Sequence, residues 1–257
     1  MKVISICNQK GGAGKTTTAG ALWAYLRGRG FRVLAIDMDG QHNLSFSSCA
    51  AGEGASILGV LLHEVGIKEA IQHTAAGDII PGVDMLNNAD TLLNRAGLAG
   101  SEYRLKGVLA ELEGSYDYII IDTPPHLGAL ILNALTASDY VLIPAQADIY
   151  NMQGISQLYE TIGTVKQFCN PSLKVLGIVL TRYNARTKIA QDIRGTLEGT
   201  AARIGTRLFA SAIRESTTVK EAQAAQQPLL DYAPKSKVSE DYIKLFNEIG
   251  AIINPVT

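Results

Sequence analysis

Residues 8–18 are Asn8-Gln9-Lys10-Gly11-Gly12-Ala13-Gly14-Lys15-Thr16-Thr17-Thr18, and they follow the apolar residues 3–7 near the start of the chain. Glycines allow a turn to fold around an anion with its N–H groups pointing inward, and the N-terminus of a helix adds the positive end of its dipole. Lys15 is placed to bring a full charge to the β- and γ-phosphates of a nucleotide, and the Thr16 hydroxyl is a hard oxygen ligand for Mg²⁺. With a predicted strand before it and a predicted helix after it, the segment indicates a phosphate-binding loop.

The loop departs from the common pattern G-x-x-x-x-G-K-[ST], because Gln9 occupies the position of the first glycine. A second lysine, Lys10, stands five residues before Lys15. The resulting K-G-G-x-G-K-T-T pattern resembles the deviant Walker A motif of the ParA/MinD family of ATPases. In that family the extra lysine reaches across a dimer to the nucleotide of the partner. The resemblance therefore implies an ATP-sandwich homodimer in which Lys10 acts in trans, with a plain surface charge as the alternative.

The same resemblance implies which loop residues hold ATP. They are Lys10, Gly11, Gly12, Ala13, Gly14, Lys15, Thr16 and Thr17. Of these, Lys10 and Lys15 are also expected to act in hydrolysis, because each brings a positive charge to the transferring phosphate.

Two aspartates, Asp37 and Asp39, follow the apolar residues 33–36, and ligands of open α/β sheets bind at such strand ends. The segment from Asp37 to Gln41 resembles the switch I motif D-x-D-P-Q of the family, with Gly40 in place of the proline. By that match Asp39 is catalytic and orients the attacking water, while Asp37 supports the metal or the loop. Taken alone, such a pair is also typical of a turn or a helix cap. Without the proline the turn is expected to be more mobile.

A third aspartate, Asp122, ends the apolar residues 118–121 in the Walker B arrangement, where a carboxylate holds Mg²⁺, usually through a water. The continuation Asp122-Thr123-Pro124-Pro125 resembles the switch II motif of the family. Thr16, Asp37 and Asp122 are therefore the residues expected at the metal, and ATP and Mg²⁺ are the expected cofactors.

Short apolar runs alternate with longer segments of helical pattern. Strands are predicted at residues 3–7, 33–36, 79–80, 118–121, 140–143, 175–180 and 208–213, and helices at 16–29, 56–64, 90–99, 101–112, 127–137, 152–168, 188–204, 218–226 and 239–253. Continuous apolar runs are typical of strands buried on both faces, which favours a doubly wound α/β fold, a mostly parallel sheet flanked by helices. Residues 45–55 and 82–101 are expected to form loops or mobile insertions. No linker divides the chain, so residues 1–257 are expected to form a single P-loop ATPase domain.

The composition excludes several classes of protein. Hydrophobic residues make up 47% of the 257 residues, which excludes a disordered or low-complexity chain. The net charge of −1 disfavours a highly basic nucleic-acid coat, and three well-separated cysteines argue against a disulfide framework. No apolar run approaches the ~20 residues of a membrane span, so a soluble cytoplasmic protein is expected.

The resemblance extends over nearly the whole chain. Residues 181–187 are similar to a T-x-[YL]-[DN]-x-R-T stretch of the family, and residues 213–229 are similar to the loop and helix that flank the adenine. Arg214 is therefore expected at the nucleotide, although this chain has Arg214-Glu215 where the family has Pro-Arg. The last predicted helix has an apolar face, but its polar face mixes acidic residues with Lys244, so packing against the sheet is favoured over membrane binding.

Residues 182–220 contain eight Lys or Arg and three Asp or Glu, a net charge of +5 in a chain whose total is −1. In a ParA-like dimer such charges would line a surface for non-specific double-stranded DNA by contacting phosphates, whereas the alternative is a set of solvated helix faces. The residues proposed for DNA are Arg182, Arg186, Lys188, Arg203, Arg207, Lys220, Lys235 and Lys237.

The resemblance implies a slow, Mg²⁺-dependent ATP hydrolase that segregates plasmid, chromosome or mobile-element DNA. The ATP-bound dimer would bind the nucleoid, and a ParB-like centromere-binding partner would stimulate hydrolysis. Two alternatives stay open at this point. One is a MinD/ParA-type positioning ATPase for a protein assembly or a division site, and the other is a nucleotide-gated binding module with little turnover.

Overall fold

The structure is a computed structural model of the 257-residue chain, and it describes residues 1–50, 54–95 and 100–254. Within these residues one sheet of eight strands has the order β3-β4-β2-β5-β1-β6-β7-β8. The strands are β1 (Lys2–Ile6), β2 (Val33–Asp37), β3 (Gln72–Thr74), β4 (Gly77–Ile80), β5 (Tyr118–Asp122), β6 (Tyr140–Gln146), β7 (Lys174–Thr181) and β8 (Leu208–Ala212). Every neighbouring pair is parallel except β3 and β4, so the predicted α/β class with a mostly parallel sheet is confirmed.

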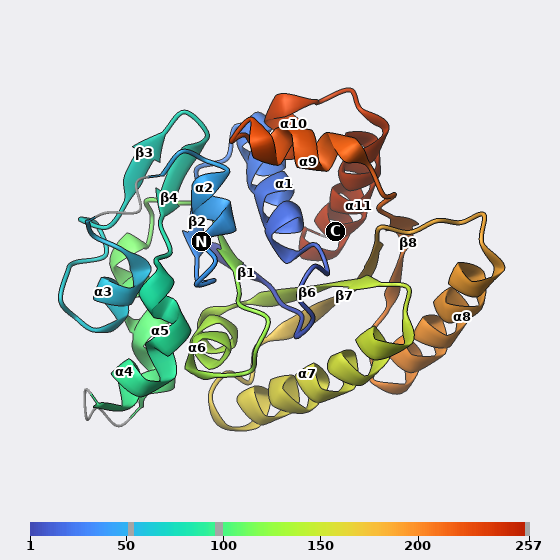
Figure 1. Cartoon of the computed structure of the whole chain (residues 1–257). Helices are drawn as coiled ribbons and strands as arrows, with labels where there is room; N and C mark the ends of the chain where they lie inside the picture. The colour runs from blue at the N-terminus through green and yellow to red at the C-terminus, as the bar shows by residue number, and fades with distance from the viewer. Residues whose placement is uncertain (51–53, 96–99, 255–257) are drawn as a thin grey trace.

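Helices cover both faces of the sheet (Figure 1). The α-helices are α1 (Lys15–Gly28), α2 (Asn43–Phe46), α3 (Ile57–Leu61), α4 (Ala89–Arg95), α5 (Arg104–Leu109), α6 (Ala129–Ala137), α7 (Ile149–Phe168), α8 (Lys188–Arg203), α9 (Thr217–Ala224), α10 (Leu229–Tyr232) and α11 (Lys237–Ile253). Three 3₁₀ turns, η1 (Asp84–Asn88), η2 (Ser101–Tyr103) and η3 (Ala110–Leu112), complete the described segments. Residues of α1, α9, α10 and α11 share one buried cluster with the sheet, and residues of α3 to α8 form two clusters on the other face.

The central strand β5 illustrates why the apolar runs are continuous. Ile120 faces the cluster that contains α1 and α11, whereas Ile119 and Ile121 face the opposite layer, and all three are fully buried. Successive side chains of a strand point to opposite faces, so a strand covered on both sides has no solvent-facing position. The sequence prediction of a doubly covered sheet is confirmed here.

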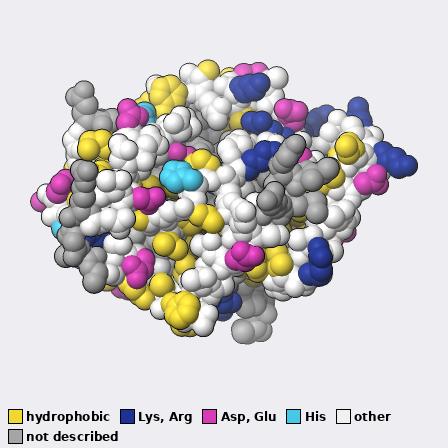
Figure 2. Space-filling model, turned by 60° about the horizontal axis from the view of Figure 1, so that its bottom comes forward, with side chains coloured by type: hydrophobic (Ala, Val, Ile, Leu, Met, Phe, Trp, Pro, Cys, Tyr) yellow, Lys and Arg dark blue, Asp and Glu magenta, His cyan; other side chains and the backbone are white. Residues whose placement is uncertain are grey.

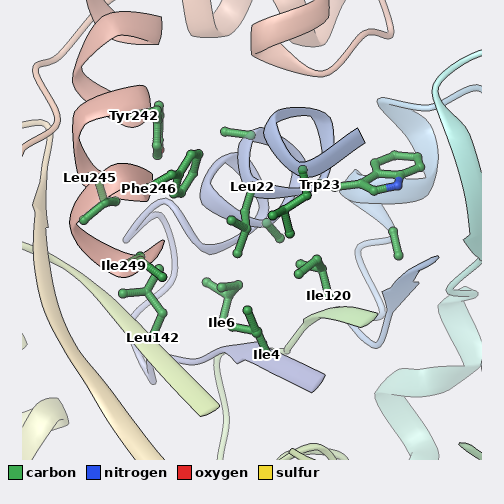
Figure 3. Close-up of a cluster of buried hydrophobic side chains, with 14 of the residues drawn as sticks. Ile4, Ile6, Leu22, Trp23, Ile120, Leu142, Tyr242, Leu245, Phe246 and Ile249 are labelled. Atoms are coloured by element: carbon green, nitrogen blue, oxygen red, sulfur yellow. The ribbon is translucent and has the colours of Figure 1, made fainter. Parts of the chain in front are cut away.

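Packing of α11 on α1 and the sheet forms one wall of the core (Figure 3). The buried side chains of α11 in this cluster are Val238, Tyr242, Leu245, Phe246, Ile249 and Ile253. They face Leu22 of α1 and the sheet residues Ile4 and Ile6, as predicted for the last helix. None of the helices in the described parts of the chain has the length and apolar character needed to cross a bilayer.

Several local predictions were wrong. The edge strand β3 was not expected, because Gln72, His73 and Thr74 carry no apolar alternation and pair only with β4. Residues 84–88, expected in a loop, form η1, whereas α4 (Ala89–Arg95) agrees with the helix predicted at 90–99. Ser45 and Phe46, also expected in a loop, belong to α2 (Asn43–Phe46). The helix expected at 101–112 is divided into η2, α5 and η3. Residues 51–53 and 96–99 of the predicted loops lie outside the described residues.

Parallel strands bring their carboxyl ends to one edge of the sheet. In the pairing of β2 with β5, Asp37 lies opposite Asp122, and in the pairing of β1 with β5, Ile6 lies opposite Asp122. The segment that follows Ile6 therefore starts beside both carboxylates. The strand order thus places residues 8–18 and the two predicted metal-site aspartates at the same edge.

Candidate nucleotide-binding site

The predicted phosphate-binding loop connects β1 to α1 and ends at Gly14, the N-cap of α1. Gly12 and Gly14 have φ angles of 77° and 87°, in the left-handed region that residues with a Cβ rarely adopt. A Cβ on Gly14 would also lie 3.3 Å from the Thr181 methyl group. Backbone conformation and space together explain why glycine is required at position 14.

The side chain of Lys15 is buried at the start of α1 and forms no ion pair within the described residues; its ammonium lies 3.4 Å from the Lys10 carbonyl oxygen. Burial lowers the pKa of Lys15, while the nearby carboxylates of Asp122 and Asp39 oppose that shift. A buried ammonium at the N-terminus of a helix favours an anionic ligand, because such a ligand would supply the missing counter-charge.

Hydrogen bonds between the loop and the strands β6 and β7 hold the loop in shape. The Asn8 amide donates to a carbonyl of β6 at 2.5 Å, and the Gln146 amide donates to the Gly12 carbonyl at 2.7 Å. The Thr181 hydroxyl donates to the Ala13 carbonyl at 2.8 Å. The sequence analysis assigned no role to these three side chains. Asn8 follows β1, whereas Gln146 and Thr181 end β6 and β7, and the positions of these two become informative once the strand order β1-β6-β7 is known.

Lys10, predicted to act in trans, has a partner in its own chain. Its ammonium lies 2.6 Å from a carboxylate oxygen of Asp148, and the two side chains are 34% and 30% exposed. Among the described residues, Lys10 does not line the cavity formed by Gly11, Lys15 and Asp39. Any role in a second subunit would require Lys10 to leave Asp148.

Residues 37–46, termed the switch I loop because they contain the segment that resembles switch I, are organised around Asp37. One carboxylate oxygen of Asp37 accepts hydrogen bonds from the N–H and hydroxyl of Ser45 at 2.8 and 2.7 Å, and the other accepts from the Asp39 N–H at 3.2 Å. Burial raises the pKa of Asp37 to about 6, although these hydrogen bonds oppose the shift. Of the two roles predicted for Asp37, these contacts are those of loop support.

Asp39 lies at the edge of a cavity of about 220 Å³ that is also lined by Gly12, Lys15, Thr16 and Pro125. One of its carboxylate oxygens accepts the Gln41 N–H at 3.0 Å. The structure therefore brings Asp39 and the phosphate-binding loop to the same cavity, as the sequence predicted.

Asp122 is fully buried, and among the described residues neither of its carboxylate oxygens forms a hydrogen bond of good geometry, although the Thr16 side chain lies close to it. Burial raises its pKa well above the usual range for an aspartate, reinforced by the charge of Asp37, while the Thr16 side chain and the Lys15 ammonium lower it. An unpaired buried carboxylate is unfavourable, and a cation would relieve it. A carboxylate beside the Thr16 hydroxyl is the kind of oxygen donor set that suits Mg²⁺.

A second cavity of about 220 Å³ adjoins the loop beside Gly14 and Thr17 and is lined by Arg214 and Tyr242, among others. The Arg214 guanidinium forms two hydrogen bonds of 2.6 and 2.7 Å to Asp241, whose side chain is 8% exposed. Arg214 thus lies at a cavity next to the loop, with its charged group held by α11. Arg182 lines both cavities, which the sequence analysis did not expect for a residue assigned to DNA.

The residues predicted for DNA binding are all exposed, and none forms an ion pair among the described residues. They are Arg182, Arg186, Lys188, Arg203, Arg207, Lys220, Lys235 and Lys237. Figure 2 shows that dark blue side chains gather on the right of that face, the side on which α8 lies in Figure 1. The structure therefore leaves these charges available to solvent.

Comparisons with known proteins identify the family. A family profile described as an AAA domain matches residues 1–175. The chromosome partitioning protein ParA of Myxococcus xanthus is 38% identical over 260 residues, which cover 96% of this chain and 87% of that protein. The chain belongs to the ParA/Soj family of ATPases. The sporulation initiation inhibitor protein Soj of Bacillus subtilis is 35% identical, with 97% and 98% of the two chains covered.

Solved structures resemble this ParA/Soj-family chain over nearly its full length. A cobyrinic acid a,c-diamide synthase from Mycobacterium smegmatis, with bound ATP analogue and magnesium, matches with a TM-score of 0.84 at 34% identity, covering 98% and 94% of the chains. The cell division ATPase MinD of Pyrococcus furiosus matches with a TM-score of 0.77 at 26% identity, covering 98% and 99%. The resemblance to the ParA/MinD superfamily inferred from residues 8–18 is therefore confirmed.

Proposed function

We propose that this ParA/Soj-family chain is a Mg²⁺-dependent ATP hydrolase that partitions DNA. The observation that carries the proposal is the unpaired, buried Asp122 carboxylate beside the buried Lys15 ammonium at a glycine-rich loop. Both groups are unfavourable in isolation, and a nucleotide phosphate with its cation would supply the missing partner of each.

In this proposal the N–H groups of the loop and Lys15 hold the phosphates, and the Thr16 hydroxyl and Asp122 hold Mg²⁺. The bound ion would neutralise charge on the β- and γ-phosphates. Asp39 orients the attacking water by accepting one of its protons in a hydrogen bond. Arg214 lines the cavity next to the loop, and its side chain is held by Asp241. In this position Arg214 would shape the site of the adenine base.

Two subunits are proposed to close around two nucleotides. Lys10 would exchange its bond with Asp148 for the phosphates of the partner, in the manner of an arginine finger. The closed dimer would bring together two copies of the exposed basic residues around α8, and such a doubled surface would bind duplex phosphates without base contacts. Hydrolysis, stimulated by a ParB-like partner, would open the dimer and release the DNA. The chain would then act in the cytoplasm on the nucleoid.

ATP binding and turnover test the nucleotide part of the proposal. Lys15→Ala is expected to abolish both, whereas Lys166→Ala, which removes an exposed lysine at the end of α7, should leave them unchanged. Asp39→Ala should retain ATP binding and lose turnover by ~100-fold or more, the usual contribution of a positioned proton acceptor. Wild-type turnover no faster than that of Asp39→Ala, with or without a partner, would instead support a nucleotide-gated binding module.

Filter binding to a duplex of arbitrary sequence tests the DNA part. Binding should require ATP and fall steeply with salt, and Lys10→Ala should abolish it. The double variant Arg186→Ala/Lys188→Ala should reduce the slope of log K against log salt by ~0.9 for each DNA phosphate that the protein no longer neutralises. Lys106→Ala on α5 is the control for a remote exposed lysine. Binding to anionic liposomes in place of DNA would favour a positioning ATPase.

A further inference from the structure

A short segment after β4 contacts both the loop that carries Asp39 and the start of α6, which are far apart in sequence. This bridging segment (residues 82–90) leaves the carboxyl end of β4, forms η1 (Asp84–Asn88) and enters α4 (Ala89–Arg95). Its first half lies against the switch I loop, and α4 lies against α6, which follows Asp122 and the two prolines (Figure 1). The sequence analysis expected only an irregular insertion here.

At the switch I end, three contacts join the segment to the loop that carries Asp39. The Gly82 N–H donates to the Ser45 hydroxyl at 3.0 Å, and that hydroxyl itself donates to Asp37. His42 Nε2 lies 3.0 Å from a carboxylate oxygen of Asp84. These two contacts hold the loop at Ser45 and His42. A third close approach lies at the turn directly after Asp39.

The third contact is between Gly40 and Asn87. A Cβ on Gly40 would lie 2.6 Å from Asn87 Cγ and 2.8 Å from Asn87 Nδ2, so a larger residue at position 40 would require the exposed Asn87 side chain to move. Glycine itself imposes little stiffness on a turn. The Asn87 side chain therefore lies against the backbone directly after Asp39.

At the other end, the segment holds the start of α6. A carboxylate oxygen of Asp90 accepts the Ala129 N–H at 2.6 Å, which satisfies a free donor of the first turn. A Cβ on Gly128 would lie 2.7 Å from the other Asp90 oxygen, so a second glycine permits a second close approach. Asn87 lies in η1 and Asp90 in α4, and these two elements follow each other directly in the chain.

We infer that the bridging segment couples the Asp39 loop to the start of α6, and that Asn87 and Asp90 are positioning residues for hydrolysis. The kinetic consequence rests on the proposed function, since it presumes that Asp39 orients water. The mechanical coupling does not, because it is argued from contacts at both ends of one continuous segment, η1 followed by α4. Among the described residues, neither Asn87 nor Asp90 lines the two cavities at the phosphate-binding loop, so the coupling should affect turnover more than nucleotide binding.

Hydrogen–deuterium exchange of the full chain tests the coupling without any need for activity. Asn87→Ala should speed exchange in peptides covering residues 39–46 by ~threefold or more, because local opening becomes easier. Asn88→Ala is the matched control, since Asn88 is an equally exposed neighbour with no close approach to Gly40. Asp90→Ala should speed exchange at residues 39–46 as well, although Asp90 does not contact them. Unchanged exchange at 39–46 in Asp90→Ala would overturn the coupling.

Steady-state ATP hydrolysis tests the positioning role. Asn87→Ala should lower kcat by ~3–10-fold with the ATP dissociation constant within about twofold of wild type, as expected when only the geometry around the water-orienting group is loosened. Asp90→Asn, which keeps an acceptor oxygen, should restore most of the activity that Asp90→Ala loses. Asn88→Ala should match wild type.

A double substitution tests the contact itself. Gly40→Ala should lower kcat when Asn87 is present, because the new methyl group collides with the amide. In the Asn87→Ala background, the same change should alter kcat by less than about twofold. The two effects should not add, because the two residues are in contact. Additive losses, or equal effects of Asn87→Ala and Asn88→Ala, would refute the positioning role. If the wild-type chain hydrolyses no ATP, the proposed function fails while the exchange experiment still decides the coupling.

Discussion

The ion pair between Lys10 and Asp148 predicts how tightly two subunits should associate. Lys10 is proposed to serve the nucleotide of the partner, yet in the isolated chain its ammonium lies 2.6 Å from Asp148. Association must break this pair in both subunits. Asp148→Asn removes the charge with little change of shape, so it should release Lys10 and strengthen the ATP-bound dimer.

The exposure of the pair sets the size of the effect. The two side chains are 34% and 30% exposed, so solvent screens their attraction. Partly exposed pairs of this kind contribute ~0.2–1 kcal/mol each. Two pairs per dimer give ~0.4–2 kcal/mol, which corresponds to a dimer dissociation constant lower by roughly 2–30-fold. The effect should shrink as the salt concentration increases, because added ions screen the attraction between the two partly exposed charges further.

Sedimentation velocity with a non-hydrolysable ATP analogue and Mg²⁺ measures that dissociation constant. Asp231→Asn is the control, because it breaks an ion pair of similar exposure, to Arg27 at 2.5 Å, on the helical layer formed by α1 and α10. Lys10→Ala should prevent association in both the wild-type and the Asp148→Asn background. An Asp148→Asn chain that dimerises no more tightly than Asp231→Asn would refute the reasoning that Asp148 holds Lys10 back.

Three further predictions concern stability and binding. Phe246→Ala removes a fully packed ring between α11 and α1 and should lower the free energy of unfolding by ~3–5 kcal/mol in guanidinium titrations; a loss below ~1 kcal/mol would contradict that packing. Asp122→Asn replaces an unpaired buried carboxylate with a neutral group and should raise the apo protein's free energy of unfolding by ~1–3 kcal/mol while abolishing Mg²⁺-dependent hydrolysis; lower apo stability would mean that the carboxylate has a partner. Gly14→Ala forces a Cβ into a left-handed residue 3.3 Å from Thr181 and should cost ~1–2 kcal/mol of stability and weaken ATP binding, whereas Gly163→Ala, which meets no atom within 4 Å, should do neither.

Local chemistry was enough to predict the centre of the candidate site. Residues 8–18, the aspartates after residues 33–36 and the aspartate after residues 118–121 each carry their signal within a few consecutive residues. The structure brings Lys15, Thr16, Asp39 and Asp122 together at one edge of the sheet, and the family membership is confirmed. Strand ends in a parallel sheet share an edge, so the pattern of apolar runs also predicted where these residues would meet.

Strand order decided what surrounds that centre. Gln146 and Thr181 brace the phosphate-binding loop because β6 lies next to β1 and β7 lies next to β6. Asp148 meets Lys10 for the same reason. These residues stand more than 130 positions in sequence from the loop residues they contact, and their local patterns gave no sign that they would brace the loop.

The bridging segment shows the limit of sequence patterns most clearly. Gly40 was noted only for the missing proline, and residues 82–89 only for a composition typical of loops. The tertiary structure showed that the Asn87 side chain lies beside Gly40. Periodicity and loop motifs report on neighbours along the chain, so they determined the sheet and the phosphate site. Close approach between exposed segments depends on how the layers pack, and only the folded arrangement fixes it.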